Sequence, residues 1–209
     1  MLWGCAVLAM VSVIGANIWR GRAGGSARTA ADMPHEPQEH LPILAEAPAF
    51  ALVDQNEKPV TLEALHGAPF IANFIFTHCA GPCPVMTAKM SKLQQAVPAA
   101  VKLVSVTVDP TQDRPAVLKE YAGKFNADDS RWRFLTPAKV EDANDVYALA
   151  RGMLIAAMPA KDENPIIHSE KFVLVDADGK IRAYYDSGDA EQMTKLKADA
   201  AELAGAAGK

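Results

Sequence analysis

Two cysteines lie four positions apart in the stretch 76–84, which reads Phe-Thr-His-Cys-Ala-Gly-Pro-Cys-Pro. The chain has three cysteines in all, and Cys79 and Cys83 fall where an apolar run gives way to a helical pattern. Cys83 is expected at the start of that helix, where unpaired N–H groups and the helix dipole stabilise a thiolate. Pro84 suits the first helical turn. Such a pair could form a disulfide or bind a soft metal ion.

The spacing of the two cysteines bears on their chemistry. Thiol–disulfide exchange normally uses Cys-x-x-Cys, whereas three residues separate Cys79 from Cys83. The additional residue loosens the loop and leaves room for an ion between the two sulfur atoms. Two thiolates suit copper(I), which prefers soft ligands, whereas copper(II) requires a nitrogen ligand as well.

A histidine is therefore needed elsewhere in the chain, and His168 is the candidate. It lies at the start of a predicted strand, 85 positions after Cys83, and follows a long polar loop at 158–165. His78 adjoins a proposed ligand, so its ring is expected to point away from the sulfur pair. His66 precedes a turn glycine and is expected at the surface.

The segments around these residues alternate between strand and helix patterns. Residues 68–76 form an apolar run rich in β-branched and aromatic side chains, which is typical of a buried central strand. From residue 83 the apolar period changes to that of a helix, which Pro98 ends. The other predicted elements are strands at 50–53, 101–108 and 132–135, a helix at 115–125 capped by Asp113, a helix at 140–152, a hairpin of 172–175 and 181–185 around the turn Asp176–Gly179, and a helix at 190–203.

The order of these elements predicts an α/β domain with a mixed central sheet and flanking helices, because parallel crossovers come first and a hairpin last. The pattern matches a thioredoxin-like fold with one inserted strand–helix pair. Met86 and Met90 recur at helical spacing, so they are expected in the core rather than among metal ligands.

Composition narrows the class of protein. Half of the 209 residues are hydrophobic and 22% are charged, which is typical of a globular chain and not of a disordered one. Three cysteines are too few for a disulfide-stapled scaffold or a four-cysteine zinc module. Residues 1–31 have three arginines and no acid, which leaves 18 Lys and Arg against 25 Asp and Glu, a formal charge of −7. No basic face is evident, so a nucleic-acid partner is not expected.

The amino-terminal segment predicts a membrane anchor. Residues 2–19 contain no charged side chain and would form about 27 Å of helix, close to the thickness of the hydrocarbon core of a bilayer. Trp19 ends this run and Arg20 and Arg22 follow it, as expected at a membrane interface. The chain therefore divides into three predicted parts, which are an anchor at 1–20 (or a cleaved signal peptide), a flexible tether at 21–47 and a folded domain at 48–209.

Four segments of the chain, in order and spacing, resemble the Sco/SenC family of copper proteins, and the resemblance covers roughly residues 45–204. One segment is Thr77-His78-Cys79 with Cys83-Pro84. The others are 106–110 with its Asp-Pro strand end and Asp113, the helix segment 121–125, and His168-Ser169 with the hairpin segment 173–179.

The resemblance implies a thioredoxin fold anchored at a membrane and a role in assembling the CuA centre of cytochrome c oxidase. It implies a copper site formed by Cys79, Cys83 and His168, and Asp109 matches a family acid near that site. The implied partners are the CuA-bearing subunit of the oxidase and other copper chaperones. The implied location is a bacterial inner membrane with the folded domain in the periplasm, whereas the arginines after the apolar run favour the cytoplasmic side.

Two functions stay open on this interpretation. A copper metallochaperone, which is not an enzyme, would use Cys79, Cys83 and His168 to deliver copper to the oxidase subunit. A thiol–disulfide reductase would keep the CuA cysteines reduced and would need only the two cysteines. The family usually has Pro directly after the first cysteine, whereas this chain has Ala80 and places a proline at 82. This difference alters the loop and leaves open the balance between copper transfer and thiol exchange.

Overall fold

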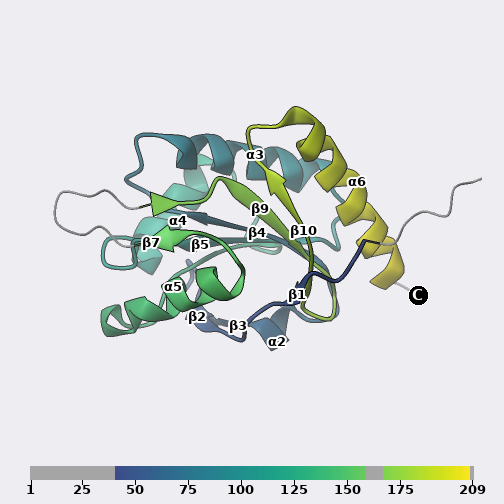
Figure 1. Ribbon diagram of the computed structural model, residues 1–209. Coiled ribbons are helices and arrows are strands. Elements are labelled where there is room, and N and C mark those ends of the chain that lie inside the picture. Colours follow the sequence, from purple (N-terminus) through teal and green to yellow (C-terminus); the bar gives the residue numbers. More distant parts are fainter. Residues whose placement is uncertain (1–40, 159–166, 208–209) are drawn as a thin grey trace, which may run out of the picture. The chain divides into compact units, whose positions relative to one another are not determined.

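The computed structural model describes residues 41–158 and 167–207 (Figure 1). The chain divides into two units, Met1–His40 and Leu41–Lys209, and the described residues belong to the second. The predicted anchor at 1–20 and the predicted tether up to residue 40 lie outside the described residues. No helix within 41–158 or 167–207 is both long enough and apolar enough to cross a membrane.

A six-stranded mixed sheet runs through the second unit, in the strand order β1-β10-β9-β4-β5-β6 (Figure 1). β4, β5 and β6 are parallel to one another, while β9 is antiparallel to β4, β10 to β9 and β1 to β10. The mixed α/β sheet expected from the sequence is confirmed. The strands are β1 (Ala45–Glu46), β4 (Phe70–Ile75), β5 (Lys102–Thr107), β6 (Trp132–Leu135), β9 (Lys171–Val175) and β10 (Lys180–Asp186).

Two short antiparallel strand pairs accompany this sheet. β2 (Ala51–Val53) pairs with β3 (Pro59–Thr61), and β7 (Ala157–Met158) pairs with β8 (Ile167–His168). The sequence patterns predict β2 but not β3 or β7. β3 and β7 are as short as β2 or shorter and contain no apolar run like the one at 50–53, so no sequence pattern marks them as strands.

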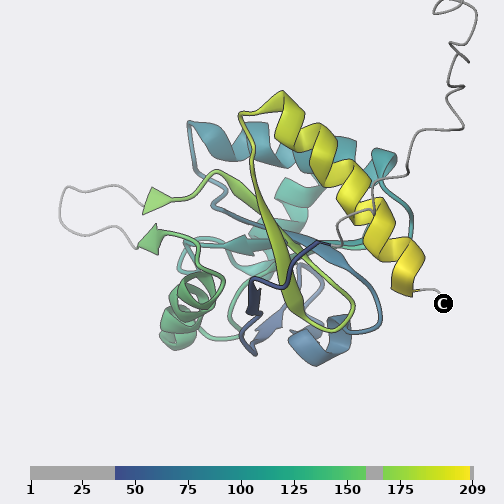
Figure 2. The same ribbon diagram turned by 45° about the vertical axis from the view of Figure 1, so that its right-hand side comes forward.

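Helices cover both faces of the main sheet (Figure 2). One face packs against α3 (Pro82–Ala96), α4 (Pro115–Lys124) and α6 (Ala190–Ala207). The other face packs against α2 (Leu62–Leu65) and α5 (Ala143–Gly152). The 3-10 turn η2 (Val140–Asp142) precedes α5.

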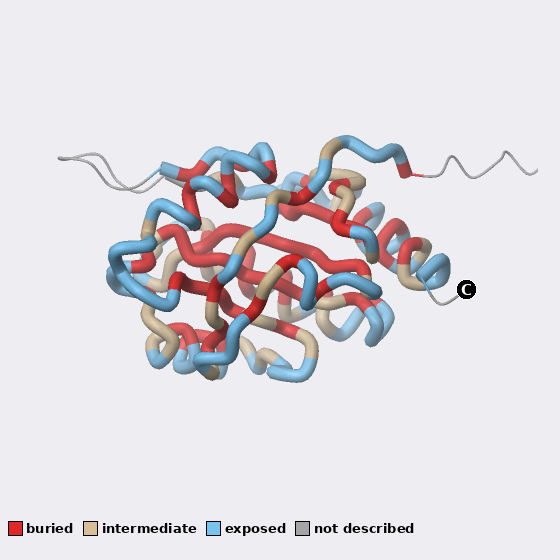
Figure 3. The backbone as a smooth tube through the Cα atoms, turned by 90° about the horizontal axis from the view of Figure 1, so that it is seen from below, coloured by how far each residue is buried: buried red, intermediate tan, exposed pale blue. Residues whose placement is uncertain are grey.

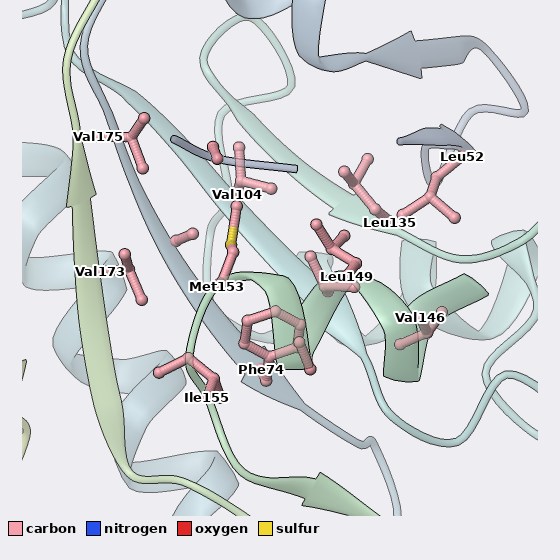
Figure 4. Close-up of a cluster of buried hydrophobic side chains, with 14 of the residues drawn as sticks. Leu52, Phe74, Val104, Leu135, Val146, Leu149, Met153, Ile155, Val173 and Val175 are labelled. Carbon is pink, nitrogen blue, oxygen red and sulfur yellow. The ribbon is translucent and has the colours of Figure 1, made fainter. Parts of the chain in front are cut away.

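β4 separates the two halves of the core. All six of its residues are buried, and Figure 3 shows buried backbone, in red, running through the middle of the unit. Alternate side chains of β4 belong to the clusters on opposite faces of the sheet, as strand geometry requires. Phe74 packs with Val146 and Leu149 of α5 (Figure 4). Ile75 belongs to the cluster on the opposite face, with Met86 of α3. An apolar run without polar alternation is therefore what this central strand needs.

Residues 41–47, which the sequence pattern assigns to the tether, are part of the folded unit. β1 lies within them and pairs with β10. The guanidinium of Arg182 donates hydrogen bonds to the carbonyl oxygen of Leu41, one of them 3.0 Å long. The side chains of Leu41 and Ala47 are buried. These contacts join segments about 140 positions apart, so local composition does not reveal them.

The start of α4 differs from the prediction. Arg114, rather than Asp113, occupies the N-cap position, and no side chain caps the helix there. Pro115 lies in the first turn, as expected. The carboxylate of Asp113 instead accepts hydrogen bonds from Thr77, in the loop that follows β4. A buried network outcompetes the helix cap for this side chain.

The hairpin between β9 and β10 confirms the predicted turn at 176–179. Oδ1 of Asp176 accepts hydrogen bonds from the N–H groups of Asp178 (3.0 Å) and Lys180 (2.8 Å). Gly179 has a φ of +78°, a conformation that side chains with a Cβ rarely adopt. A Cβ at this position would also lie 2.9 Å from Nε2 of His66. The turn therefore requires glycine.

The prediction that Met86 and Met90 are core residues is confirmed, since both are fully buried. We expect Met90→Ala to lower the free energy of unfolding by about 2–5 kcal/mol, because it leaves a cavity. Met90→Leu should cost less than about 1.5 kcal/mol, because the side-chain volume is nearly kept. Denaturant unfolding followed by circular dichroism measures both, and equal losses would contradict a close-packed site.

Candidate functional site

The connection between β4 and α3 places the two cysteines. β4 ends at Ile75, a loop follows, and α3 begins at Pro82, so Cys83 lies in the first helical turn. Cys83 is fully buried, whereas Cys79 in the loop is partly exposed, and neither is in a disulfide. The sequence thus predicts the position of this pair correctly, but it does not reveal the difference in burial.

Backbone N–H groups hold both sulfur atoms. The N–H of Phe76 donates to Sγ of Cys83 (3.4 Å), and the N–H of Gly81 donates to Sγ of Cys79 (3.3 Å). A side-chain hydrogen bond also joins Cys83 to Cys79. The two thiols are therefore neighbours, and the partly exposed thiol of Cys79 is open to an approaching molecule.

Burial raises the pKa of the Cys83 thiol well above its usual value. The N–H of Phe76 opposes this effect, whereas the hydrogen bond with Cys79 adds to it. The position of Cys83 at a helix start led us to expect a stabilised thiolate. Desolvation outweighs the helix terminus at this depth, so Cys83 is a neutral thiol near pH 7.

Two side-chain hydroxyl groups stabilise the backbone of the first turn of α3. The hydroxyl of Thr87 donates to the carbonyl oxygen of Cys83 (2.9 Å), and the hydroxyl of Tyr121 lies 3.1 Å from Oγ1 of Thr87. Because the single hydroxyl hydrogen of Thr87 goes to Cys83, Tyr121 is the donor in the second bond. Burial raises the pKa of Tyr121 to about 12, which keeps this donor protonated.

Asp113 ties the cysteine loop to the end of β5. Its Oδ2 accepts hydrogen bonds from the N–H of Thr77 (3.0 Å) and the hydroxyl of Thr107 (2.6 Å). Its Oδ1 accepts from the hydroxyl of Thr77 (2.5 Å). Burial raises the pKa of this carboxyl group, while the bonds from Thr107 and Thr77 lower it. Local sequence patterns do not reveal this role, because Thr77 and Asp113 lie 36 positions apart.

Asp109 takes part in the turn that follows β5. Its Oδ1 accepts a hydrogen bond from the hydroxyl of Thr111 (2.7 Å), and its carbonyl oxygen accepts from the N–H of Asp113 (2.9 Å). The backbone bond closes a five-residue turn, and the side-chain bond with Thr111 lies within it. They give Asp109 a part in shaping the segment that carries Asp113, and its expected place beside a metal stays a prediction.

The backbone of His168 lies in β8, opposite Ala157 of β7. β9 runs antiparallel to β4, so the chain just before β9 lies at the end of the sheet where β4 ends. Figures 1 and 2 both place β7 and β8 at the same end as the loop before α3. The side chain of His168 lies outside the described part of the structure, so its role as a ligand stays a prediction.

The ring of His78 points toward Asp113 rather than toward the core. Its Nδ1 lies 3.1 Å from Oγ1 of Thr77 and 4.0 Å from Oδ1 of Asp113, and the side chain is 67% exposed. Within the described side chains, no three His, Cys, Asp or Glu residues form a group that could hold a metal ion.

These features define an α/β domain with two thiols between a central strand and the helix that follows it. The SCO1/SenC family model matches residues 39–203, and the chain therefore belongs to the SCO1/SenC family. The SCO1 protein homolog of Bacillus subtilis (strain 168) is 36% identical over 148 residues, which cover 69% of this chain and 76% of the relative.

Solved structures agree with this assignment. Bradyrhizobium japonicum ScoI, solved with copper bound, has a TM-score of 0.63 and 27% identity, over 76% of this chain and 99% of that one. BsSco, described as a member of the Sco family of cytochrome c oxidase assembly proteins with a disulfide switch, has a TM-score of 0.63 and 32% identity, over 76% and 95%. The predicted thioredoxin-like fold of the domain is thereby confirmed, as is the resemblance on which the predicted site depends.

The difference in burial predicts unequal reactivity of the two thiols. We expect Cys79 in a Cys83→Ser variant to react with iodoacetamide at least about tenfold faster near pH 8 than Cys83 in a Cys79→Ser variant, because alkylation needs an accessible thiolate. Mass spectrometry of quenched samples measures both rates. Unfolding in denaturant should make the two rates similar, and equal rates in the folded protein would contradict the unequal burial.

Proposed function

We propose that this protein is a membrane-tethered copper metallochaperone that delivers copper to the CuA-bearing subunit of cytochrome c oxidase. The observation that carries the proposal is the paired thiol groups of Cys79 and Cys83, one accessible and one buried, in a Sco-family domain. The solved relative from Bradyrhizobium japonicum, which contains bound copper, supports the same assignment.

The donor set suits the cargo. Two sulfur donors match copper(I), and the imidazole of His168 would supply the nitrogen that copper(II) prefers. A metal that binds a thiol displaces its proton, so binding to Cys83 has to overcome the raised pKa of that group. The buried sulfur then holds the ion away from water, while the loop sulfur leaves it open on one side.

The unequal burial gives a direction to transfer. A partner thiolate reaches the ion from the side of Cys79 and replaces the loop sulfur as a ligand. The copper stays copper(I) throughout, because thiolate replaces thiolate. When the ion leaves, Cys83 takes up a proton, which its raised pKa favours. Reprotonation of the buried thiol thus helps release, and other copper chaperones would load the site by the reverse exchange.

The proposed location is a bacterial inner membrane, with residues 1–20 as the anchor and the folded domain in the periplasm. The uncharged run at 2–19 supports an anchor. The periplasm is an oxidising compartment in which a pair of cysteines can form a disulfide, and this suits the reactive pair of this chain. The arginines after the run oppose this orientation, so fusion of a periplasmic reporter enzyme after residue 209 is the direct test.

Copper titration of the full 209-residue chain tests the proposal. We expect one copper(I) ion per chain under anaerobic conditions, with affinity lowered at least about tenfold (1.4 kcal/mol) by Cys79→Ser or Cys83→Ser. His168→Ala should keep copper(I) but lose copper(II), because only the oxidised ion needs the nitrogen ligand. Competition with a chromogenic chelator measures both affinities.

His66→Ala is the matched control, since His66 is exposed at the end of α2. This variant should bind both ions as the parent does. A His168→Ala protein that binds copper(II) and delivers copper to the CuA domain as the parent does would contradict the proposed ligand set.

A thiol–disulfide reductase is the second candidate, and the exposed and buried thiols favour it too. Cys79 as thiolate would attack a partner disulfide and form a mixed disulfide, and Cys83 would then attack Cys79 and release the reduced partner. The pair loses two electrons, which a separate dithiol reductant has to restore. Two results together would favour this function. The His168→Ala protein would reduce an oxidised CuA domain at the parent rate, and the parent would not bind copper tightly.

A further inference from the structure

Asp113 is a fully buried carboxylate whose hydrogen bonds serve the cysteine loop rather than its own helix. Three donors converge on it, namely the N–H and the hydroxyl of Thr77 and the hydroxyl of Thr107. Thr77 lies two positions before Cys79. The carboxylate therefore fixes both the backbone and the side chain of the residue from which the cysteine turn starts.

No lysine or arginine among the described residues forms an ion pair with Asp113. Its ion-pair contact in that part of the chain is with Nδ1 of His78 at 4.0 Å, in a ring that is 67% exposed. Other buried aspartates differ, since Asp54 pairs with Arg133 and Asp199 with Lys195. The hydrogen bonds of Thr77 and Thr107 thus carry most of the stabilisation of the Asp113 carboxylate.

The network extends from Asp113 to the side chain next to Cys79. The hydroxyl of Thr77 has one hydrogen, which it gives to Asp113. Oγ1 of Thr77 therefore accepts from Nδ1–H of His78, at 3.1 Å. One carboxylate thus orders Thr77 and His78, the two residues that precede the accessible cysteine.

We propose that Asp113 is a positioning residue of the dithiol site: through Thr77 it fixes the turn that carries Cys79, and so sets the equilibrium between the dithiol and the disulfide of Cys79 and Cys83. The same turn would place Cys79 as a copper ligand, a part that rests on the proposed function. A buried carboxylate with a purely structural role would affect folding stability without affecting this equilibrium.

Equilibration of the metal-free full chain with dithiothreitol tests the proposal. Asp113→Asn weakens the hydrogen bonds that hold Thr77 and so loosens the turn that brings the sulfurs together, which disfavours the disulfide. We expect the equilibrium constant for disulfide formation to fall at least about tenfold, which corresponds to a rise of about 30 mV in reduction potential. Thr77→Val, which keeps the charge but removes the hydroxyl, should shift it in the same direction by a smaller factor.

Three further variants make the test specific. Thr77→Ser keeps both donors and should stay within about twofold of the parent. Asp199→Asn, which removes a buried carboxylate of α6 bonded to Tyr185 of β10 and to Lys195 of α6, should lower the unfolding midpoint but leave the disulfide equilibrium unchanged. The double variant Asp113→Asn/Thr77→Val should shift the equilibrium no further than Asp113→Asn alone, because both changes break one interaction.

An unchanged equilibrium in Asp113→Asn, or additive effects in the double variant, would overturn the proposal. If Asp113→Asn does not fold, Thr77→Val against Thr77→Ser decides the question. Copper(I) dissociation to a chelator is measured in parallel and should be faster in Asp113→Asn. Failure of the parent to bind copper would refute the proposed function alone, since the redox test uses metal-free protein.

Discussion

The parallel pairing of β4 with β5 is the constraint on which the site depends. Ile75 lies opposite Thr107 at the end of the pair, and the N–H of Val108 donates to the carbonyl oxygen of Ile75 (2.7 Å). Two loops therefore leave the sheet side by side at the same edge. One carries the cysteines and the other carries Asp113, so a contact between residues far apart in sequence follows from strand register.

The two sulfur atoms gain different properties from this arrangement. Cys83 is buried beneath the loop by the first turn of α3, and Cys79 stays within reach of solvent. Such a pair suits both a soft metal ion and a partner disulfide. In each case one sulfur has to be accessible to the partner molecule, and the other has to act as the second ligand or to resolve the mixed disulfide. Membership of the SCO1/SenC family favours a cytochrome c oxidase subunit as the proposed partner. The proposed third ligand, His168, distinguishes copper(II) binding, which needs it, from thiol–disulfide exchange, which does not.

Local patterns predict much of this fold but not the depth of its site. The apolar run of β4, the helical spacing of Met86 and Met90 and the Asp176–Gly179 turn are encoded within a few neighbouring residues, and all three are confirmed. The burial of Cys83 and the contact of Asp113 with Thr77 depend on segments that the fold brings together. Cys83 lacks the thiolate expected at a helix start because its desolvation depends on tertiary packing. Asp113 does not cap α4 because Thr77, which is distant in sequence, donates hydrogen bonds to it.

β1 closes the side of the sheet opposite β6. It pairs with β10 through two residues only, Ala45 and Glu46, and Arg182 holds the preceding backbone at Leu41. A long unpaired strand at a sheet edge can recruit a strand from another molecule, whereas a two-residue edge next to a charged ion pair such as Glu46 with Lys180 offers almost no template. At Lys180 and Ile181 the sheet therefore ends in a strand too short to recruit a strand from another molecule.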